Sequence, residues 1–170
     1  IHYTMKKIIS AFLFSFLTCC LSAQNPSIEI LSTGTKTSLR GLSVVNDNII
    51  WVSGSNGIVG RSTNAGKNWK WLTVTGFEKT EFRDIEAFDG NTAIIMGIGE
   101  PAYILKTTDA GENWKVVYEN KTKGMFLDAM DFANNREGIV IGDPINGKVF
   151  IARTSNTGNT WEQITEDERT

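Results

Sequence analysis

The chain is 170 residues long, with 17 Lys and Arg against 19 Asp and Glu, which gives a formal net charge of −2. This mild acidity gives no electrostatic footprint for nucleic acid or anionic lipid, so neither is an expected partner. The single histidine is His2, and the two cysteines are Cys19 and Cys20. Chemistry that needs histidine or cysteine is therefore confined to the N-terminal segment.

The N-terminal segment predicts export. Residues 5–23 begin at Met5 with Lys6 and Lys7, continue with the apolar run Ile8–Leu17, and end in Leu21-Ser22-Ala23. This order predicts a secretory signal peptide, so we expect a periplasmic or extracellular protein with no membrane span after cleavage. An uncleaved anchor is the alternative, but the apolar run is short for one. Residues 1–4 precede Met5 and are interpreted as upstream read-through.

Cleavage of this signal would remove every cysteine and histidine. Leu17–Cys20 resembles a lipoprotein signal, but Cys19 stands where Gly or Ala is usual, so lipid anchoring at Cys20 or Cys19 is the less favoured alternative. The mature chain then has no disulfide, thiolate metal site, Ser-His-Asp triad or His-ligated zinc, and no cofactor or metal is expected. Loss of Lys6 and Lys7 leaves 15 basic residues (17 − 2) against 19 acidic ones, a net charge of −4.

Residues 24–38 are expected to carry the fourth strand of a repeat unit whose first three strands are not in this segment. Glu29–Gly34, followed by Thr37–Gly41, parallels Lys70–Gly76 followed by Thr80–Asp84 at the end of the first unit below. We interpret residues 24–38 as an outer strand that closes the last unit of a ring.

Three units follow, each with four short segments rich in β-branched and aromatic residues and separated by turn residues. Helical periodicity is absent after the leader, so the predicted class is all-β. The predicted strands are Leu39–Val45, Ile49–Ser53, Ile58–Ser62 and Trp69–Val74, then Arg83–Phe88, Ala93–Gly97, Ala102–Thr107 and Trp114–Tyr118, then Leu127–Phe132, Gly138–Gly142, Lys148–Thr154 and Trp161–Thr165.

One eight-residue pattern recurs between the third and fourth segments of every unit. It reads hydroxyl, any residue, Asp or Asn, a small residue, Gly, two polar residues and Trp. The glycines fall at 66, 111 and 158, which gives periods of 45 (111 − 66) and 47 (158 − 111), and such periods indicate stacked repeats. The pattern residues are Ser62, Asn64, Gly66 and Trp69, then Thr107, Asp109, Gly111 and Trp114, then Thr154, Asn156, Gly158 and Trp161.

The pattern predicts a β-hairpin turn. The short Asp or Asn side chain can accept hydrogen bonds from backbone N–H groups just ahead of it, and Gly supplies a positive φ. The Trp would open the next strand and pack its ring under the turn. The pattern therefore has a structural role.

These turns resemble the Asp-box, or bacterial neuraminidase repeat, of β-propeller blades in sialidases, sortilin-type receptors and the photosystem II assembly and stability factor family. Tandem copies one blade apart look most like the last family and its non-photosynthetic bacterial relatives. The resemblance implies three four-stranded blades at the N-terminal end of a six- to eight-bladed ring, and a small self-contained three-blade module is the alternative. The implied blades are residues 39–76, 77–120 and 121–166, with 167–170 beginning the next.

Strand order places the candidate ligand residues on the face opposite the pattern turns. Arg40 and Arg83 hold the same repeat position at the mouth of the innermost strand, where the third unit has Leu127. Two guanidinium groups there would suit a carboxylate or sulfate. The alternative is that each arginine braces the loop by pairing with an acid such as Asp84 or Asp128.

Glu100 and Asp143 are a second candidate pair, since each precedes proline after a strand that ends in glycine. Paired carboxylates on one face could act as general acid and base in a glycosidase. Asp-Pro and Glu-Pro are also ordinary turn formers. A sialidase-like site lacks support, because there is no Arg-Ile-Pro signature and Tyr103 and Tyr118 lie in predicted strands.

The combined prediction is an exported, non-catalytic propeller that acts as a scaffold for a protein or carbohydrate partner. No catalytic residue is assigned. A glycoside hydrolase whose catalytic residues lie partly in further blades is the alternative from a different class, and a cell-surface domain fused to a sorting or adhesion module is a third. Trp51 and Trp71 are expected to pack between blades.

Overall fold

The structure is a computed structural model that describes residue 28 and residues 34–164. The chain divides into two units, residues 1–30 and 31–170, and the account below concerns the second. The predicted read-through, signal peptide and lipid sites lie outside the described residues, as do most of the strand expected at 24–38 and the start of a further unit at 167–170. No helix among the described residues has the length and apolar character to cross a membrane.

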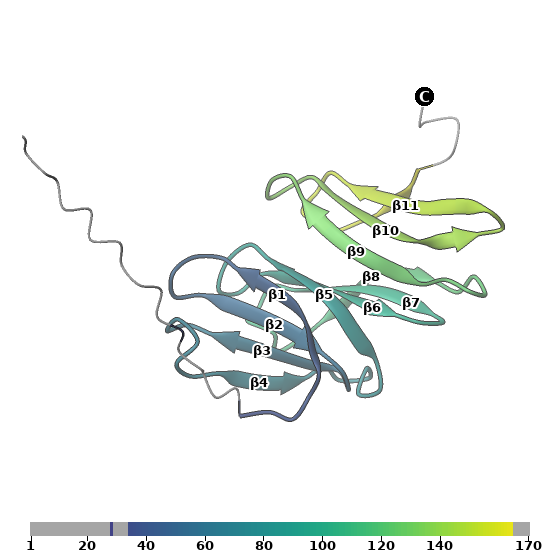
Figure 1. The fold of residues 1–170 in the computed structure, drawn as a ribbon. Coiled ribbons are helices and arrows are strands. Elements are labelled where there is room, and N and C mark those ends of the chain that lie inside the picture. The colour runs from purple at the N-terminus through teal and green to yellow at the C-terminus, as the bar shows by residue number, and fades with distance from the viewer. Residues whose placement is uncertain (1–27, 29–33, 165–170) are drawn as a thin grey trace, which may run out of the picture. The chain divides into compact units, whose positions relative to one another are not determined.

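Within residues 34–164, twelve strands form three four-stranded antiparallel sheets, each with its strands in chain order (Figure 1). The all-β prediction is thereby confirmed. The first sheet contains β1 (Leu39–Val44), β2 (Ile50–Gly54), β3 (Ile58–Ser62) and β4 (Lys70–Thr73); the second β5 (Glu81–Ala87), β6 (Ala93–Ile98), β7 (Ala102–Thr107) and β8 (Lys115–Asn120); the third β9 (Leu127–Phe132), β10 (Gly138–Ile145), β11 (Lys148–Thr154) and β12 (Glu162–Gln163).

The sheets pack face to face, with β5 in contact with β1 on one side and β9 on the other. The second sheet lies between the other two, so β6 is buried along Ala93–Gly97 and forms a continuous apolar run rather than an alternating one. Its side chains divide between two cores. Ile95 joins Trp51 in the core against the first sheet, whereas Ile94 joins Leu127 in the core against the third.

The observed strands match the predicted ones to within two residues at each end, except at the end of β10. Each pattern Trp lies just before its strand, because the turn ends there and pairing starts one residue later. The segment after Gly142 was expected to be a loop, but β10 continues to Ile145. It ends in a tight turn at Asn146 and Gly147, with φ of 53° and 77°. Two consecutive positive φ values are typical of a two-residue hairpin loop.

Candidate functional site

The three pattern turns share one hydrogen-bond scheme, built on two side-chain acceptors. The opening hydroxyl accepts from the glycine N–H four residues on, at 2.9 Å for Ser62 and 3.0 Å for Thr107 and Thr154. The Asn or Asp Oδ1 accepts from the N–H four residues ahead, at 2.8 to 3.1 Å. The role of the Asn or Asp is as predicted. That of the hydroxyl was missed, although a hydroxyl residue opens the pattern in every copy.

The turns also require two consecutive residues of positive φ rather than one. Gly111 has φ of 86°, and Ala110 before it has 63°. The same pairing occurs at Ala65 and Thr157 ahead of their glycines, with φ of 58° and 60°. Non-glycine residues adopt this conformation rarely, and β-branched Thr157 does so least readily, so the surrounding turn bonds must hold Ala65, Ala110 and Thr157 in it.

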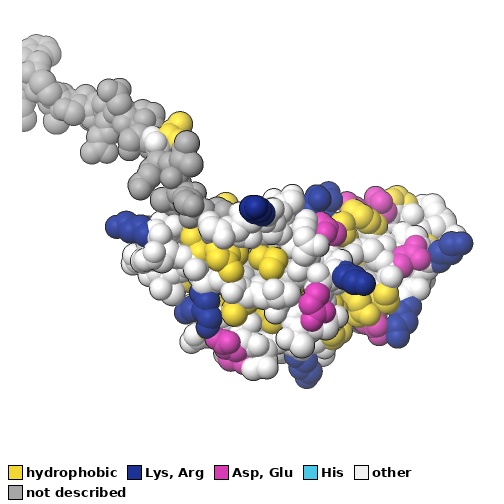
Figure 2. Space-filling view, turned by 90° about the horizontal axis from the view of Figure 1, so that it is seen from below, with side chains coloured by type: hydrophobic (Ala, Val, Ile, Leu, Met, Phe, Trp, Pro, Cys, Tyr) yellow, Lys and Arg dark blue, Asp and Glu magenta, His cyan; other side chains and the backbone are white. Residues whose placement is uncertain are grey.

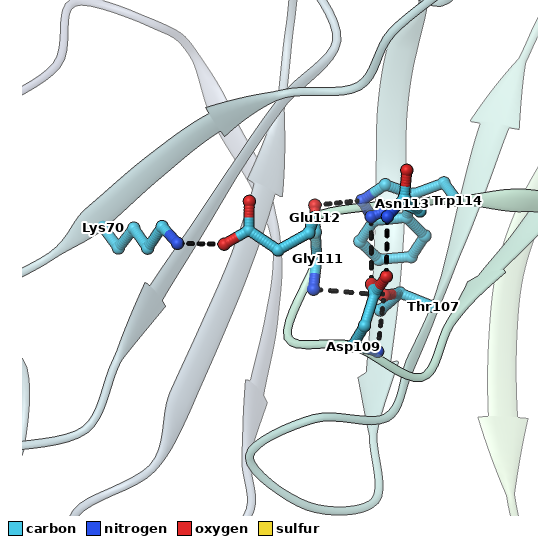
Figure 3. A network of polar contacts seen from close by, with 7 residues as sticks. All are labelled: Lys70, Thr107, Asp109, Gly111, Glu112, Asn113 and Trp114. Atoms are coloured by element: carbon cyan, nitrogen blue, oxygen red, sulfur yellow. Dashed lines mark hydrogen bonds and ion pairs between the residues drawn. The ribbon is translucent and has the colours of Figure 1, made fainter.

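Asp109 makes one more side-chain bond than Asn64, its counterpart in the first turn (Figure 3). Its Oδ1 accepts from the Asn113 N–H, and its Oδ2 accepts from the Asn113 side-chain amide at 2.8 Å. The Trp114 ring closes the turn by donating its Nε1–H to the Gly111 carbonyl at 3.0 Å. The Asn113 side-chain and backbone bonds, together with the Thr107 hydroxyl, hold the pKa of Asp109 below its usual value.

We predict that Asn64→Asp raises the thermal midpoint at pH 7 by about 1–3 °C. Asn68 occupies the position in the first turn that Asn113 has in the second. With Asp at position 64, the Asn68 side-chain amide can donate to the second carboxylate oxygen, as Asn113 does to Asp109. The new carboxyl should have a lowered folded-state pKa, like Asp109. Its contribution is therefore present above the unfolded pKa of about 4 and lost as pH falls through the folded value.

Asn156→Asp is the matched control, because the Asn156 amide already donates to the Thr160 hydroxyl at 2.9 Å. That replacement should leave the midpoint nearly unchanged. Equal midpoint shifts for Asn64→Asp and Asn156→Asp in differential scanning calorimetry from pH 3 to 7 would contradict the prediction.

Each of the second and third turns docks on the preceding sheet. From the second sheet, Lys106 donates its Nζ to the Thr157 carbonyl at 2.7 Å and to the Asn159 Oδ1 at 2.9 Å. Burial lowers the pKa of this ammonium. Lys70 likewise forms an ion pair with Glu112 of the second turn (Figure 3). Sequence reasoning missed Lys106, although a basic residue directly precedes the hydroxyl in all three units.

The opposite face carries the predicted arginines on β-bulges. Each innermost strand has one extra residue between two consecutive pairs with its neighbour, and these residues are Arg40, Arg83 and Asp128. The prediction that Leu127 is the third counterpart is therefore wrong. Leu127 instead pairs with Gly142 and is buried in the core between the second and third sheets.

Both arginines bridge neighbouring sheets. Arg40 Nε lies 3.6 Å from Glu81 Oε2, and Arg83 lies 3.7 Å from Asp128 Oδ1 while its Nε donates to the Asp128 carbonyl at 2.9 Å. Arg83 also stacks over Phe126, with the guanidinium carbon 5.3 Å from the ring centroid. Of the two bracing partners suggested by the sequence, Asp128 contacts Arg83. Asp84 instead accepts the backbone N–H groups of Ile85 and Met130.

Glu100 and Asp143 are not equivalent in the structure. Asp143 directly follows Gly142, whereas Glu100 lies three residues beyond Gly97, the counterpart of Gly142 in the register. Glu100 accepts the Gly124 N–H, and the Asp143 N–H donates to the Phe126 carbonyl at 2.9 Å. The predicted equivalence is therefore wrong, and the two residues are held by separate contacts.

A row of acids lies further along the inner strands. Burial raises the pKa of Asp84, and burial followed by the charges of Asp131 and Asp84 raises that of Glu86. Among residues 34–164, no group of three or more His, Cys, Asp and Glu has the arrangement to hold a metal ion. Because their pKa values are raised, the ionisation of Asp84 and Glu86 makes the stability of the fold depend on pH.

We predict that Glu86→Gln raises the thermal midpoint at pH 7 by about 1–3 °C. The raised folded-state pKa means that ionised Glu86 opposes folding at neutral pH, and the neutral amide removes that cost. The advantage should shrink as pH falls through the folded pKa and vanish below the unfolded value of about 4.3. Differential scanning calorimetry of the parent and the Glu86→Gln variant across pH 4 to 8 measures this difference in thermal midpoint.

Asp47→Asn serves as the control, since Asp47 is exposed in the turn between β1 and β2. It should change the midpoint little at any pH. A Glu86→Gln gain that persists unchanged at pH 4 would show that the effect is not the titration of Glu86.

Four-stranded antiparallel sheets that stack through their faces, with each first strand innermost, define the blades of a β-propeller. The solved structures to which the chain is similar include two of YCF48. The chain matches YCF48 bound to D1 peptide at 22% identity and a TM-score of 0.62, over 78% of this chain and 41% of that one. It matches YCF48 from Cyanidioschyzon merolae at 20% identity and a TM-score of 0.56, over 82% of this chain and 44% of that one.

The likeness concerns the fold, and the chain spans about two-fifths of the length of these structures. It confirms the predicted fold class, a β-propeller. No family model matches the chain, and no curated protein matches it.

Proposed function

We propose that this chain is a non-catalytic propeller scaffold that binds an acidic protein segment on the face carrying Arg40 and Arg83. The observation that carries the proposal is that both guanidinium groups sit on bulges of neighbouring innermost strands and stay partly exposed. Their ion pairs with Glu81 and Asp128 are long, at 3.6 and 3.7 Å. Such half-exposed pairs contribute little to stability, so a carboxylate ligand can replace the existing partners.

A protein partner is favoured over a carbohydrate because one similar structure, that of YCF48, is bound to a D1 peptide. We further propose that the three pattern turns are Asp-boxes, on the strength of their common hydrogen bonds. In this proposal the turns stabilise the sheets and their packing, and they do not bind the ligand.

Fluorescence anisotropy with a labelled, extended peptide rich in Asp and Glu tests this function. The double variant Arg40→Ala/Arg83→Ala should bind this peptide about tenfold or more weakly than the parent, since each lost charged contact is worth on the order of 1 kcal/mol. Arg136→Ala is the control, because Arg136 is exposed in the turn between β9 and β10 on the opposite face. Equal affinities for the double variant and the parent would refute the proposal, as would turnover of chromogenic glycosides that is lost in the same variant.

We also propose that residues 5–23 direct export, because they carry the charged and apolar order of a secretory signal. Fusion of residues 1–30 to a phosphatase that is active only outside the cytoplasm should give activity. Replacing Leu13 with Arg in the apolar run should abolish it. Activity that survives this change would argue against a signal peptide.

A further inference from the structure

An acidic ligand meets no general excess of positive charge on this protein. The chain carries a formal net charge of −2, and basic and acidic side chains are interspersed on the face that Figure 2 draws. Binding of an acidic segment must then depend on how individual basic side chains are held rather than on a broad attractive field. The surroundings of Arg40 and Arg83 therefore decide how the proposed site works.

The residues beside the two arginines differ although the arginines hold equivalent positions. The residues two before each bulge residue are Ser38, Glu81 and Phe126 (40 − 2, 83 − 2 and 128 − 2). Arg40 of the first sheet lies against Glu81 of the second. Arg83 of the second sheet lies against Phe126, which directly precedes β9 of the third. The same repeat position therefore presents a carboxylate to Arg40 and an aromatic ring to Arg83.

Counter-charge does not distinguish the two arginines. Arg40 Nε lies 3.6 Å from Glu81 Oε2, and Arg83 Nη2 lies 3.7 Å from Asp128 Oδ1. Both distances are too long for a hydrogen bond, and all four side chains are partly exposed. A difference between the arginines must therefore come from how each guanidinium group is oriented.

Two contacts hold the Arg83 guanidinium in one orientation. Its Nε–H donates to the Asp128 carbonyl at 2.9 Å, and its central carbon lies 5.3 Å from the Phe126 ring centroid. A guanidinium that stacks on a ring can still donate its terminal N–H groups to a carboxylate. Because Arg83 is already oriented, it loses less side-chain entropy when a ligand binds.

The backbone on both sides of the Phe126 ring is also held. The Phe126 carbonyl accepts the Asp143 N–H at 2.9 Å, and a Cβ built at Gly142 would collide with that carbonyl. Met125 before it and Leu127 after it are buried in the core between the second and third sheets. Phe126 is therefore fixed to the third sheet, and it fixes Arg83 in turn.

Arg40 has a weaker hold. The Ser55 hydroxyl donates to Glu81 Oε2 at 2.6 Å, so this carboxylate is placed by Ser55. Arg40 approaches the same oxygen in a long ion pair, and half-exposed pairs of this kind order a side chain weakly. A ligand that used Arg40 would therefore have to order it on binding.

We propose that Phe126 is a positioning residue that holds Arg83 as the main carboxylate anchor of the binding face, with Arg40 as a secondary contact. The inference rests on the proposed function, because it concerns the same face and the same acidic ligand. It makes arginine necessary at position 83, since lysine has no planar group that stacks on a ring and forks to a carboxylate.

Fluorescence anisotropy with the labelled Asp- and Glu-rich peptide compares lysine at the two positions. Arg83→Lys should weaken binding by about fivefold, because the charge remains but the stacked fork is lost. Arg40→Lys should weaken it by less than about twofold, since the charge at position 40 is kept. Equal losses at the two positions would overturn the inference.

Phe126 is tested in the same assay by leucine and tyrosine. Phe126→Leu should weaken binding by about threefold, because the apolar bulk stays but the face under the guanidinium is lost. Phe126→Tyr keeps that face and should bind as the parent does. In an Arg83→Ala background, Phe126→Leu should change the affinity little, whereas a merely structural role would weaken binding in both backgrounds.

Phe77→Leu is the matched control, because Phe77 is half-buried in the loop before β5 and its ring packs on Tyr103 at 5.1 Å between centroids. It should leave binding unchanged, and thermal melts should show that both leucine variants fold. Parental affinity in Phe126→Leu, or a loss that persists in the Arg83→Ala background, overturns the inference and leaves the proposed function standing. Binding that needs neither arginine refutes the proposed function and this inference with it.

Discussion

Trp51→Ala should lower the free energy of unfolding by about 3–5 kcal/mol, the largest loss expected from a single core truncation in this chain. The Trp51 side chain is fully buried between the first and second sheets, where it packs with Phe82 and Ile85. Its Nε1–H donates to the Asp89 carbonyl at 3.1 Å, and the Arg61 guanidinium carbon lies 5.6 Å from its ring centroid. Truncation therefore opens a cavity at the interface of two sheets and leaves a carbonyl without its donor.

Urea unfolding of three variants separates these contributions. Trp51→Phe keeps much of the ring but removes the donor, so we expect a loss of about 1–2 kcal/mol. Trp71→Ala should cost less than Trp51→Ala, because Trp71 is only half-buried and stacks on Trp69 at 5.5 Å between ring centroids. Equal losses at Trp51 and Trp71 would mean that the burial of Trp51 between two sheets does not set its contribution.

The all-β class and the three units were predictable because the pattern turn makes local demands. A hydroxyl, an Asn or Asp, and a glycine must stand in fixed order for the bonds seen at Thr107, Asp109 and Gly111 to form. Because these bonds join residues only four positions apart, the pattern can be recognised directly in the sequence. Docking contacts such as Lys106 to Thr157 join residues 51 positions apart. The basic residue before each pattern hydroxyl recurs in the sequence, but no local pattern indicates which residue it contacts.

The equivalence of residues across sheets was harder to predict because the hairpins differ in length. Each sheet has a glycine that pairs with the residue just before the bulge residue, and from this glycine to the pattern Trp the spacing is 15 (69 − 54), 17 (114 − 97) and 19 (161 − 142). Counting from the tryptophans therefore misaligns the innermost strands. From the bulge residue to the same glycine the spacing is 14 in each unit (54 − 40, 97 − 83, 142 − 128). That constant spacing was the available signal for Asp128.

The residue at the third bulge determines the charge of the candidate site. A third arginine at the bulge would have made a uniformly basic rim, but Asp128 instead supplies the acid that Arg83 contacts. The arginine pair is therefore bounded on one side by its own counter-charge. The ligand surface that we propose lies over the first two sheets.

Gly158→Ala should cost about 3 kcal/mol or more, because two independent penalties fall on one position. The residue has φ of 66°, where an added Cβ costs on the order of 1–2 kcal/mol. That Cβ would also collide with Ile94, which is fully buried in the core between the second and third sheets. Overpacking of such a core typically costs a further 1–3 kcal/mol.

Gly124→Ala isolates the first penalty, since Gly124 has φ of 81° but nothing within 4 Å of an added Cβ. Gly111→Ala is intermediate, with Leu72 Cδ1 at 3.1 Å from the added atom and able to shift. The expected order of loss in urea unfolding is therefore Gly158, then Gly111, then Gly124. If Gly158→Ala cost no more than Gly124→Ala, the third turn would not be seated on Ile94.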